Sequence, residues 1–198
     1  MARVRLSGLR GGSRVHFLLA WVLCVLALLL TAATWLPGPN KVPFAAVGFV
    51  FVAIFPVFGA ALLRALISDG GRNLLGTANS RRMSRFVRSL SIGLKCSYVA
   101  VFLVALSAVA TGGGTAHDAK TDGHGGYYYT RYDKSERRSE EVVLTENEYH
   151  EANKAQARIF ASLSAVFHAT GGFLVLVAAS PEATRRAENE SETASGTG

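Results

Sequence analysis

Apolar residues along this chain gather in four long blocks, and the stretches between the blocks are polar or basic. The blocks cover residues 16–36, 43–66, 91–111 and 159–180, and they are nearly free of charged residues. A helix of about twenty apolar residues crosses the ~30 Å hydrocarbon core of a bilayer, because each residue adds ~1.5 Å. A helix in the core of a soluble protein needs no apolar block of this length. The pattern therefore predicts an all-α membrane protein, built as a bundle of four transmembrane helices.

The fourth helix is predicted to begin well before its apolar block. Thr145 and Glu148 have the capping-box spacing, in which the Thr hydroxyl accepts from a backbone N–H and the Glu carboxylate accepts from the first one. A polar run follows as far as Arg158, and no formal charge then occurs until Glu182. We therefore expect one helix with a water-facing first half and a membrane-spanning second half.

Positive charge lies beside the apolar blocks. The net charge of the chain is +7, with four arginines and no acid in residues 1–14 and five arginines against one acid in residues 68–90. Cytoplasmic segments of membrane proteins carry an excess of Lys and Arg, so both segments are predicted to be cytoplasmic. Membrane orientation explains the charge better than nucleic-acid binding does, because the longest polar segment, residues 112–154, holds nine acidic against six basic residues.

This charge distribution predicts the domain organisation. We expect a basic cytoplasmic tail over residues 1–14 and a four-helix membrane domain over residues 15–180. Residues 112–154 form an external insert of that domain, and residues 181–198 form a disordered cytoplasmic tail. The predicted localisation is the plasma membrane, with both termini in the cytoplasm.

The external insert divides into a glycine-rich part and a strand-forming part. Residues 112–126 are rich in Gly, Thr, Asp and His, and we expect them to be mobile. Residues 127–132 are aromatic and residues 140–144 contain valines, with polar residues between, which predicts a β-hairpin between the third and fourth helices. Two strands alone are marginal in water, so the hairpin is expected to lean on the last helix or on a partner. Its four tyrosines are the candidate partner surface: Tyr127, Tyr128, Tyr129 and Tyr132.

The basic segment between the second and third blocks contains an amphipathic pattern. Its apolar residues follow helical spacing at Met83, Phe86, Val87 and Leu90, and arginines occupy the other faces. One interpretation is a helix at the membrane surface whose arginines contact anionic lipid head groups, and the other is a determinant of topology only. The candidate head-group contacts are Arg81, Arg82, Arg85 and Arg88.

Three features inside the apolar blocks carry a possible function. Pro56 lies in the middle of the second block and predicts a kink, either static or a hinge. His168 lies near the middle of the last block, where an ionisable side chain is a candidate polar site. No Asp or Glu lies at comparable depth, which favours a neutral imidazole bonded to a hydroxyl of another helix over a proton relay. The following pair, Gly171-Gly172, permits close helix packing.

Candidate chemistry outside these blocks is sparse. His117, Asp118, Asp122 and His124 are residue types that bind zinc or copper, but their glycine-rich frame makes ordering costly, and the sequence leaves this site open. The chain contains no phosphate-binding loop, no H-E-x-x-H and no G-x-S-x-G motif. We therefore expect no catalytic residue, no resident metal and no cofactor.

A resemblance rests on a few motifs near the fourth helix. These are Tyr127-Tyr128-Tyr129, Glu141-Val142, Thr145-x-x-Glu148-Tyr149 and Arg158-x-Phe160. In these motifs the chain resembles small four-span membrane proteins of high-GC Gram-positive bacteria. The resemblance implies a hairpin exposed outside the membrane before the fourth helix, and it implies no activity.

These patterns favour a non-enzymatic integral membrane protein, acting as an accessory or interaction protein. Its expected partners are a bilayer with anionic head groups and a protein at the external hairpin, while the oligomeric state stays open. The alternative is a small transporter or channel subunit that uses Pro56, His168 and Gly171-Gly172, and a third hypothesis is a membrane enzyme.

Overall fold

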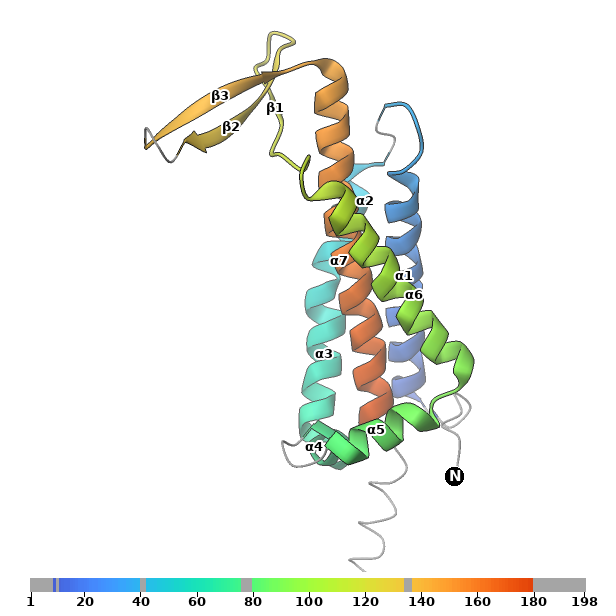
Figure 1. The fold of residues 1–198 in the computed structure, drawn as a ribbon. Coiled ribbons are helices and arrows are strands. Elements are labelled where there is room, and N and C mark those ends of the chain that lie inside the picture. The colour runs from blue at the N-terminus through green and yellow to red at the C-terminus, as the bar shows by residue number, and fades with distance from the viewer. Residues whose placement is uncertain (1–8, 10, 40–41, 76–79, 134–136, 180–198) are drawn as a thin grey trace, which may run out of the picture. The chain divides into compact units, whose positions relative to one another are not determined.

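The computed structural model of this chain describes residues 9, 11–39, 42–75, 80–133 and 137–179. Most of these residues are helical, and a small sheet follows the sixth helix (Figure 1). The helices are α1 (Gly12–Ala33), α2 (Phe44–Val52), α3 (Ile54–Ile67), α4 (Asp69–Leu75), α5 (Ser80–Ser89), α6 (Ile92–Gly112) and α7 (Glu146–Ala178). The strands are β1 (Lys120–Thr121), β2 (Tyr127–Asp133) and β3 (Arg138–Leu144). The predicted tail 181–198 and most of the predicted tail 1–14 lie outside the described residues.

Within the described part of the chain, four helical segments are long and apolar enough to cross a membrane. They are Gly12–Ala33, Phe44–Ile67, Ile92–Gly112 and Glu146–Ala178, and they contain the four predicted apolar blocks almost entirely. The prediction of a mostly helical protein with four such segments is confirmed.

The second of these segments has a one-residue interruption at Ala53, whose backbone keeps right-handed helical dihedrals. The sequence predicts one kinked helix over residues 43–66, and the structure divides it into α2, which ends at Val52, and α3, which begins at Ile54. Pro56 has no backbone N–H, so it cannot donate the helical hydrogen bond to Val52 four residues earlier. The missing hydrogen bond therefore explains why the helix is interrupted next to Val52, at Ala53.

The chain forms two compact units, and each is described by itself. Unit 1 consists of Met1–Cys24, Ala53–Val101 and Phe167–Gly198, which include α3, α4, α5 and the last part of α7. Unit 2 consists of Val25–Val52 and Phe102–Val166, which include α2, the sheet and the first part of α7. The division falls within α1, α6 and α7, so each of these helices contributes one part to each unit.

Unit 1 is held together by aromatic contacts and close helix packing. Its buried core includes Phe17, Phe86 and residues 174–177. The rings of Trp21 and Phe173 both pack edge-on against the Tyr98 ring, with centroid distances of 5.4 and 5.9 Å. Short helices α4 and α5 lie across the ends of α3 and α7 (Figure 1). The Phe86 ring of α5 packs edge-on against the Phe173 ring of α7, with a centroid distance of 5.8 Å, and this contact holds α5 in place.

The sheet of unit 2 has three antiparallel strands in the order β1-β2-β3. The predicted hairpin is confirmed as β2 and β3, with Tyr127 opposite Leu144 and Tyr129 opposite Val142. The third strand, β1, was not predicted, because the glycines of residues 112–126 indicated a loose segment. Asp122 fixes the turn instead, since its Oδ1 accepts from the backbone N–H groups of His124 at 2.7 Å and Gly126 at 2.9 Å.

The helix start at Thr145 has the predicted capping box. The backbone N–H of Thr145 donates to Glu148 Oε2 at 2.8 Å, and the backbone N–H of Glu148 donates to Thr145 Oγ1 at 3.3 Å. These bonds to the ionised form hold the pKa of the Glu148 carboxyl below its usual value. The capped residue Thr145 lies directly between the end of β3 and the start of α7, so the cap fixes the point at which the strand continues into the helix.

Candidate functional site

Strand alternation divides the four predicted tyrosines between two faces of the sheet. Successive side chains of a strand point to opposite faces, so Tyr127 and Tyr129 share one face. The Tyr127 ring stacks on the Tyr149 ring of α7, with centroids 4.4 Å apart. The Tyr129 ring stacks on the His117 ring at 4.2 Å, with the two planes only 8° apart. We call this the inner face, because its tyrosines are engaged within unit 2.

The outer face of the sheet carries the other two tyrosines. Tyr128 lies opposite Val143 in the register, and Tyr132 lies opposite Ser139. The exposed fraction is 60% for Tyr132 and 81% for Val143, which is high for apolar side chains. A partner surface on this sheet would therefore use Tyr128, Tyr132 and Val143, and not all four tyrosines.

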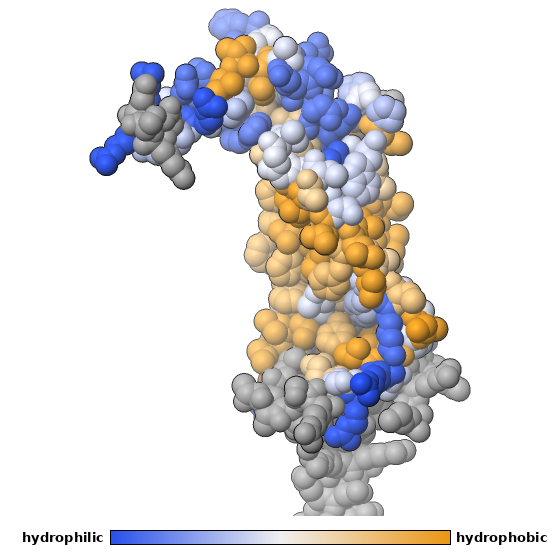
Figure 2. Space-filling view, viewed as in Figure 1, coloured by the Kyte–Doolittle hydropathy of each residue, from blue (hydrophilic) through white to orange (hydrophobic). Residues whose placement is uncertain are grey.

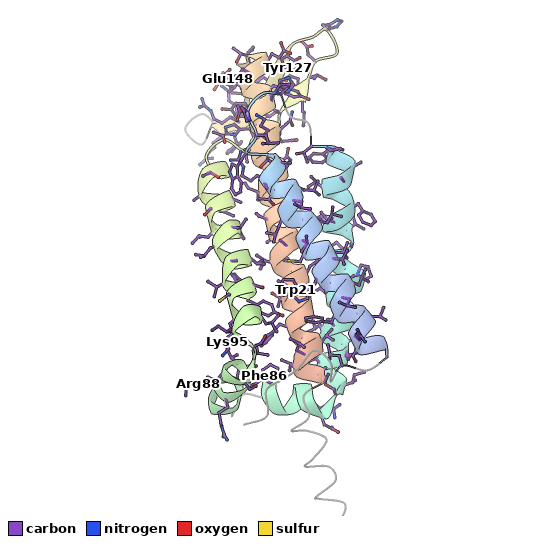
Figure 3. All side chains as sticks on the ribbon, turned by 90° about the vertical axis from the view of Figure 1, so that its right-hand side faces the viewer. Trp21, Phe86, Arg88, Lys95, Tyr127 and Glu148 are labelled. Carbon is purple, nitrogen blue, oxygen red and sulfur yellow. The ribbon has the colours of Figure 1, made fainter. Side chains whose placement is uncertain are left out.

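A groove of about 290 Å³ lies between the inner face of the sheet and the first turns of α7. Its walls include Tyr129 with His117, the apolar side chains of Val142 and Leu144, and the carboxylates of Glu148 and Glu151. Figure 3 shows Glu148 and Tyr127 close to the N-terminal end of α7. Figure 2 shows hydrophilic side chains over the sheet and over the start of this helix. The groove is therefore a mixed aromatic, apolar and acidic site.

Lys154 lies one turn beyond the groove and is buried in unit 2. Only 4% of the residue is exposed. Its Nζ donates to Glu151 Oε1 at 2.9 Å and to the backbone carbonyl of Leu36 at 3.3 Å. The ammonium is thus neutralised by one carboxylate oxygen and bonded to the loop after α1.

Arg158 is the most extensively bonded buried cation in the described part of unit 2. Its Nε donates to Thr34 Oγ1 at 3.0 Å and its Nη2 to Thr34 O at 3.2 Å. Its Nη1 donates to Thr111 O at 3.3 Å and to Thr111 Oγ1 at 3.2 Å. The guanidinium carbon also lies 5.6 Å from the centroid of the Trp35 ring.

The position of Arg158 explains how its charge is accommodated. Thr34 follows the last residue of α1, and Thr111 lies in the last turn of α6. The final carbonyls of a helix lack intrahelical partners and carry partial negative charge, so a cation there is stabilised. Arg158 therefore joins the ends of α1 and α6 to α7. The sequence analysis did not identify this role, although a lone arginine directly before an apolar block was a usable signal.

The arginines of α5 differ from Arg158. Arg85 and Arg88 are exposed, while the side chains of Arg81 and Arg82 lie outside the described set. Three residues of the predicted apolar face pack into unit 1, because Phe86 and Leu90 are buried in its core and Met83 packs against it, whereas Val87 is exposed. Lys95 Nζ donates to the backbone carbonyl of Arg88 at 2.8 Å, which stabilises the end of α5 (Figure 3).

The candidate polar site at His168 is completely buried. The neighbouring glycines are packed closely: a Cβ added at Gly172 would lie 3.3 Å from Trp21 Nε1, and one at Gly171 would lie 3.7 Å from the Phe58 Cα. A second, apolar hollow of about 100 Å³ lies beside Phe51 and Phe160 in unit 2. His168 lines neither this hollow nor the groove.

The metal-like residues of the segment before β2 have other contacts. His117 stacks on Tyr129, and Asp118 forms an ion pair with Lys120 at 3.3 Å. Asp122 accepts from the backbone of its own turn. Among the described residues, no three His, Cys, Asp or Glu side chains come together in a way that could hold a metal ion.

No protein-family model, no curated protein and no solved structure matches this chain. The resemblance to small four-span proteins of high-GC Gram-positive bacteria therefore stays a prediction.

Proposed function

We propose that this chain is an integral protein of the plasma membrane without enzymatic activity, an accessory protein whose sheet contacts a partner outside the cell. The exposed apolar surface of α6 is the observation that supports a position in the membrane. Ile92, Phe102 and Leu106 are 77%, 53% and 67% exposed, respectively. Exposed apolar area costs about 25 cal/mol per Å² in water, and a bilayer removes that cost.

The exposed apolar side chains recur along the other candidate spans. Val22 of α1, Phe55 of α3 and Leu163 of α7 are each more than a third exposed. Soluble monomers rarely expose large contiguous apolar patches. A four-helix bundle surrounded by lipid, the finer form of the predicted fold, accounts for these exposures.

The proposed orientation follows the distribution of basic residues. The exposed Arg85 and Arg88 of α5 would lie in the cytoplasm, near the anionic head groups of the inner leaflet. Four spans would then put both chain termini in the cytoplasm and the sheet outside. Lys154 and Arg158 do not oppose this orientation, because both are buried and bonded to oxygens of unit 2.

The outer face of the sheet is the proposed partner surface. Tyrosine side chains supply large contact area with little loss of conformational entropy. Tyr132 and Val143 expose such area, whereas Tyr127 and Tyr129 are occupied by ring stacks. The contacts of Gly171 and Gly172 fit close helix packing, which supports the accessory proposal over the transporter alternative.

Site-specific photo-crosslinking in living cells tests the partner surface. The photoreactive amino acid p-benzoylphenylalanine is placed at Tyr132 or Val143 of the full chain, and at the exposed Ser84 of α5 as the control on the proposed cytoplasmic side. We expect a discrete crosslinked product from the two sheet positions and none of the same size from Ser84. Equal crosslinking from all three positions, or none from Tyr132 and Val143, would contradict the proposal.

A further inference from the structure

The groove between the inner face of the sheet and α7 has the properties of a binding site for one cationic side chain. Its volume, about 290 Å³, lies near the lower end of the range of ligand pockets, roughly 300–1,000 Å³. It therefore fits a side chain better than a large cofactor. Its lining residues all belong to unit 2.

The two carboxylates in the groove differ in their described partners, and only Glu151 is paired with a cation. Glu148 and Glu151 lie three residues apart on α7, so both face the same side of the helix. The bonds from Thr145 reach Glu148 Oε2, and the bond from Lys154 reaches Glu151 Oε1. Glu151 is paired with Lys154 and also interacts with the charge of Arg158. Among the described contacts the Glu148 carboxylate accepts only from the uncharged Thr145, so it is the carboxylate available to a cation.

The walls of the groove favour a flat cation with an apolar stem. The rings of His117 and Tyr129 are nearly parallel, and flat guanidinium groups stack on aromatic faces. Val142 and Leu144 provide an apolar wall along which methylene groups pack. A guanidinium also offers paired N–H donors to a carboxylate, which an ammonium does not.

We propose that this groove binds the guanidinium of an arginine side chain presented by a partner protein. The Glu148 and Glu151 carboxylates accept its N–H groups, the His117–Tyr129 pair stacks on its plane, and Val142 and Leu144 contact its stem. This proposal rests on the proposed function in one respect, which is that a partner protein contacts the sheet. It adds that this partner presents an exposed arginine.

Methyl NMR of the full chain in detergent tests the groove without any assumption about membrane orientation. The probes are N-acetylarginine amide, N-acetyllysine amide and N-acetylcitrulline amide, which is neutral and nearly the same shape as the arginine probe. We expect saturable shifts of the Val142 and Leu144 methyl signals with the arginine probe. The lysine probe should bind about tenfold more weakly and the citrulline probe should not saturate, because hydrogen bonds to charged groups are the strong ones.

A pair of variants on one helix provides the matched control. Glu148→Gln removes a groove charge and keeps the capping bond, since Gln also serves in a capping box. Glu146→Gln changes an exposed carboxylate of the same turn that pairs with His150 and does not line the groove. We expect Glu148→Gln to weaken the arginine probe about tenfold and Glu146→Gln to leave it unchanged within about twofold.

Each contrary result overturns the proposal. Citrulline binding as tightly as arginine would exclude recognition of charge, and lysine binding as tightly would exclude the guanidinium. An equal effect of the two Glu→Gln variants would place the contact outside the groove. Because the citrulline comparison uses the unaltered protein, it decides even where a variant fails to fold. If Tyr132 crosslinks to a partner but the arginine probe does not bind the groove, this inference is wrong and the proposed function is unaffected.

Discussion

Two arginines of α5 in unit 1 and two basic residues of α7 in unit 2 differ in how their charge is accommodated. In unit 1, Arg85 and Arg88 are exposed, while Phe86 between them is buried. In unit 2, Lys154 and Arg158 of α7 are buried and donate to backbone carbonyls, to threonine hydroxyls and to one carboxylate. These two arginines of α5 therefore stay at the surface of unit 1, whereas the two cations of α7 are bonded inside unit 2.

This difference shows when the count of basic residues is informative about orientation. Exposed cations beside an apolar segment resist transfer across a membrane, and the positive-inside rule depends on that resistance. A buried arginine bonded to two helix ends stabilises the packing of those helices instead. Arg158 should therefore be left out when basic residues are counted to predict membrane orientation, whereas Arg88 should be included.

The largest expected effect comes from removing the buried guanidinium. Arg158→Met breaks four hydrogen bonds and leaves the carbonyls of Thr34 and Thr111 without this donor. We expect the free energy of unfolding in detergent to fall by about 2–4 kcal/mol, since breaking buried charged hydrogen bonds is costly. Arg158→Lys should recover only part of that loss, because one ammonium cannot reach both helix ends. A loss below about 0.5 kcal/mol would show that Arg158 does not hold α1 and α6 to α7.

Unit 1 should instead be most sensitive to added volume. A Cβ at Gly71 of α4 would collide with the backbone carbonyl oxygen of Ala65 at the end of α3. Gly71→Ala is expected to lower the free energy of unfolding by about 1–3 kcal/mol, because overpacking forces the backbone to move. The control is Gly93→Ala in α6, where no atom lies within 4 Å of an added Cβ. That change should be neutral or stabilising by up to about 1 kcal/mol, and equal losses from both variants would refute the packing argument.

A smaller effect concerns pH at the start of α7. The bonds from Thr145 lower the folded-state pKa of Glu148, so its ionised form stabilises the helix start above the unfolded-state pKa. This contribution is lost as the pH falls through the lowered pKa of the folded state. The protection factor of the Thr145 amide against hydrogen exchange should fall in the unaltered protein as the pH is lowered below the ordinary glutamate pKa. Glu148→Gln should remove this acid-dependent step, and an identical pH profile in both proteins would contradict the capping argument.

The smallest effect is expected at the exposed cations of α5. Arg88→Gln leaves the backbone carbonyl that accepts from Lys95 in place. We expect the free energy of unfolding to change by less than about 0.5 kcal/mol, as for most surface substitutions. A loss as large as that of Arg158→Met would remove the contrast between the two units.

The helices and the hairpin could be predicted from local signals. Apolar block length predicted the four candidate spans, and the Thr145–Glu148 spacing predicted the start of α7. An aromatic run and a valine-containing run on either side of a polar turn predicted β2 and β3. Pro56 located the break between α2 and α3 to within three residues, because its missing N–H acts on a residue close in sequence.

The features that could not be predicted depend on contacts between distant residues. Arg158 bonds to Thr34 and Thr111, which lie 124 and 47 residues away. The β1 strand forms because Asp122 and two glycines with positive φ, Gly123 and Gly125, make a defined turn where composition indicated mobility. The split of the tyrosines between two faces required both the register and the partners Tyr149 and His117.

The central claim is that the exposed apolar helices lie in a bilayer, with the sheet outside and α5 inside. Cysteine labelling of intact cells tests it most directly, in a background where Cys24 and Cys96 are replaced by alanine and serine. One new cysteine is placed at the exposed Thr130 of β2 or at the exposed Ser84 of α5. A membrane-impermeant maleimide should label Thr130→Cys in intact cells and Ser84→Cys only after the cells are opened. Labelling of Ser84→Cys from outside, or protection of Thr130→Cys in intact cells, would contradict the account.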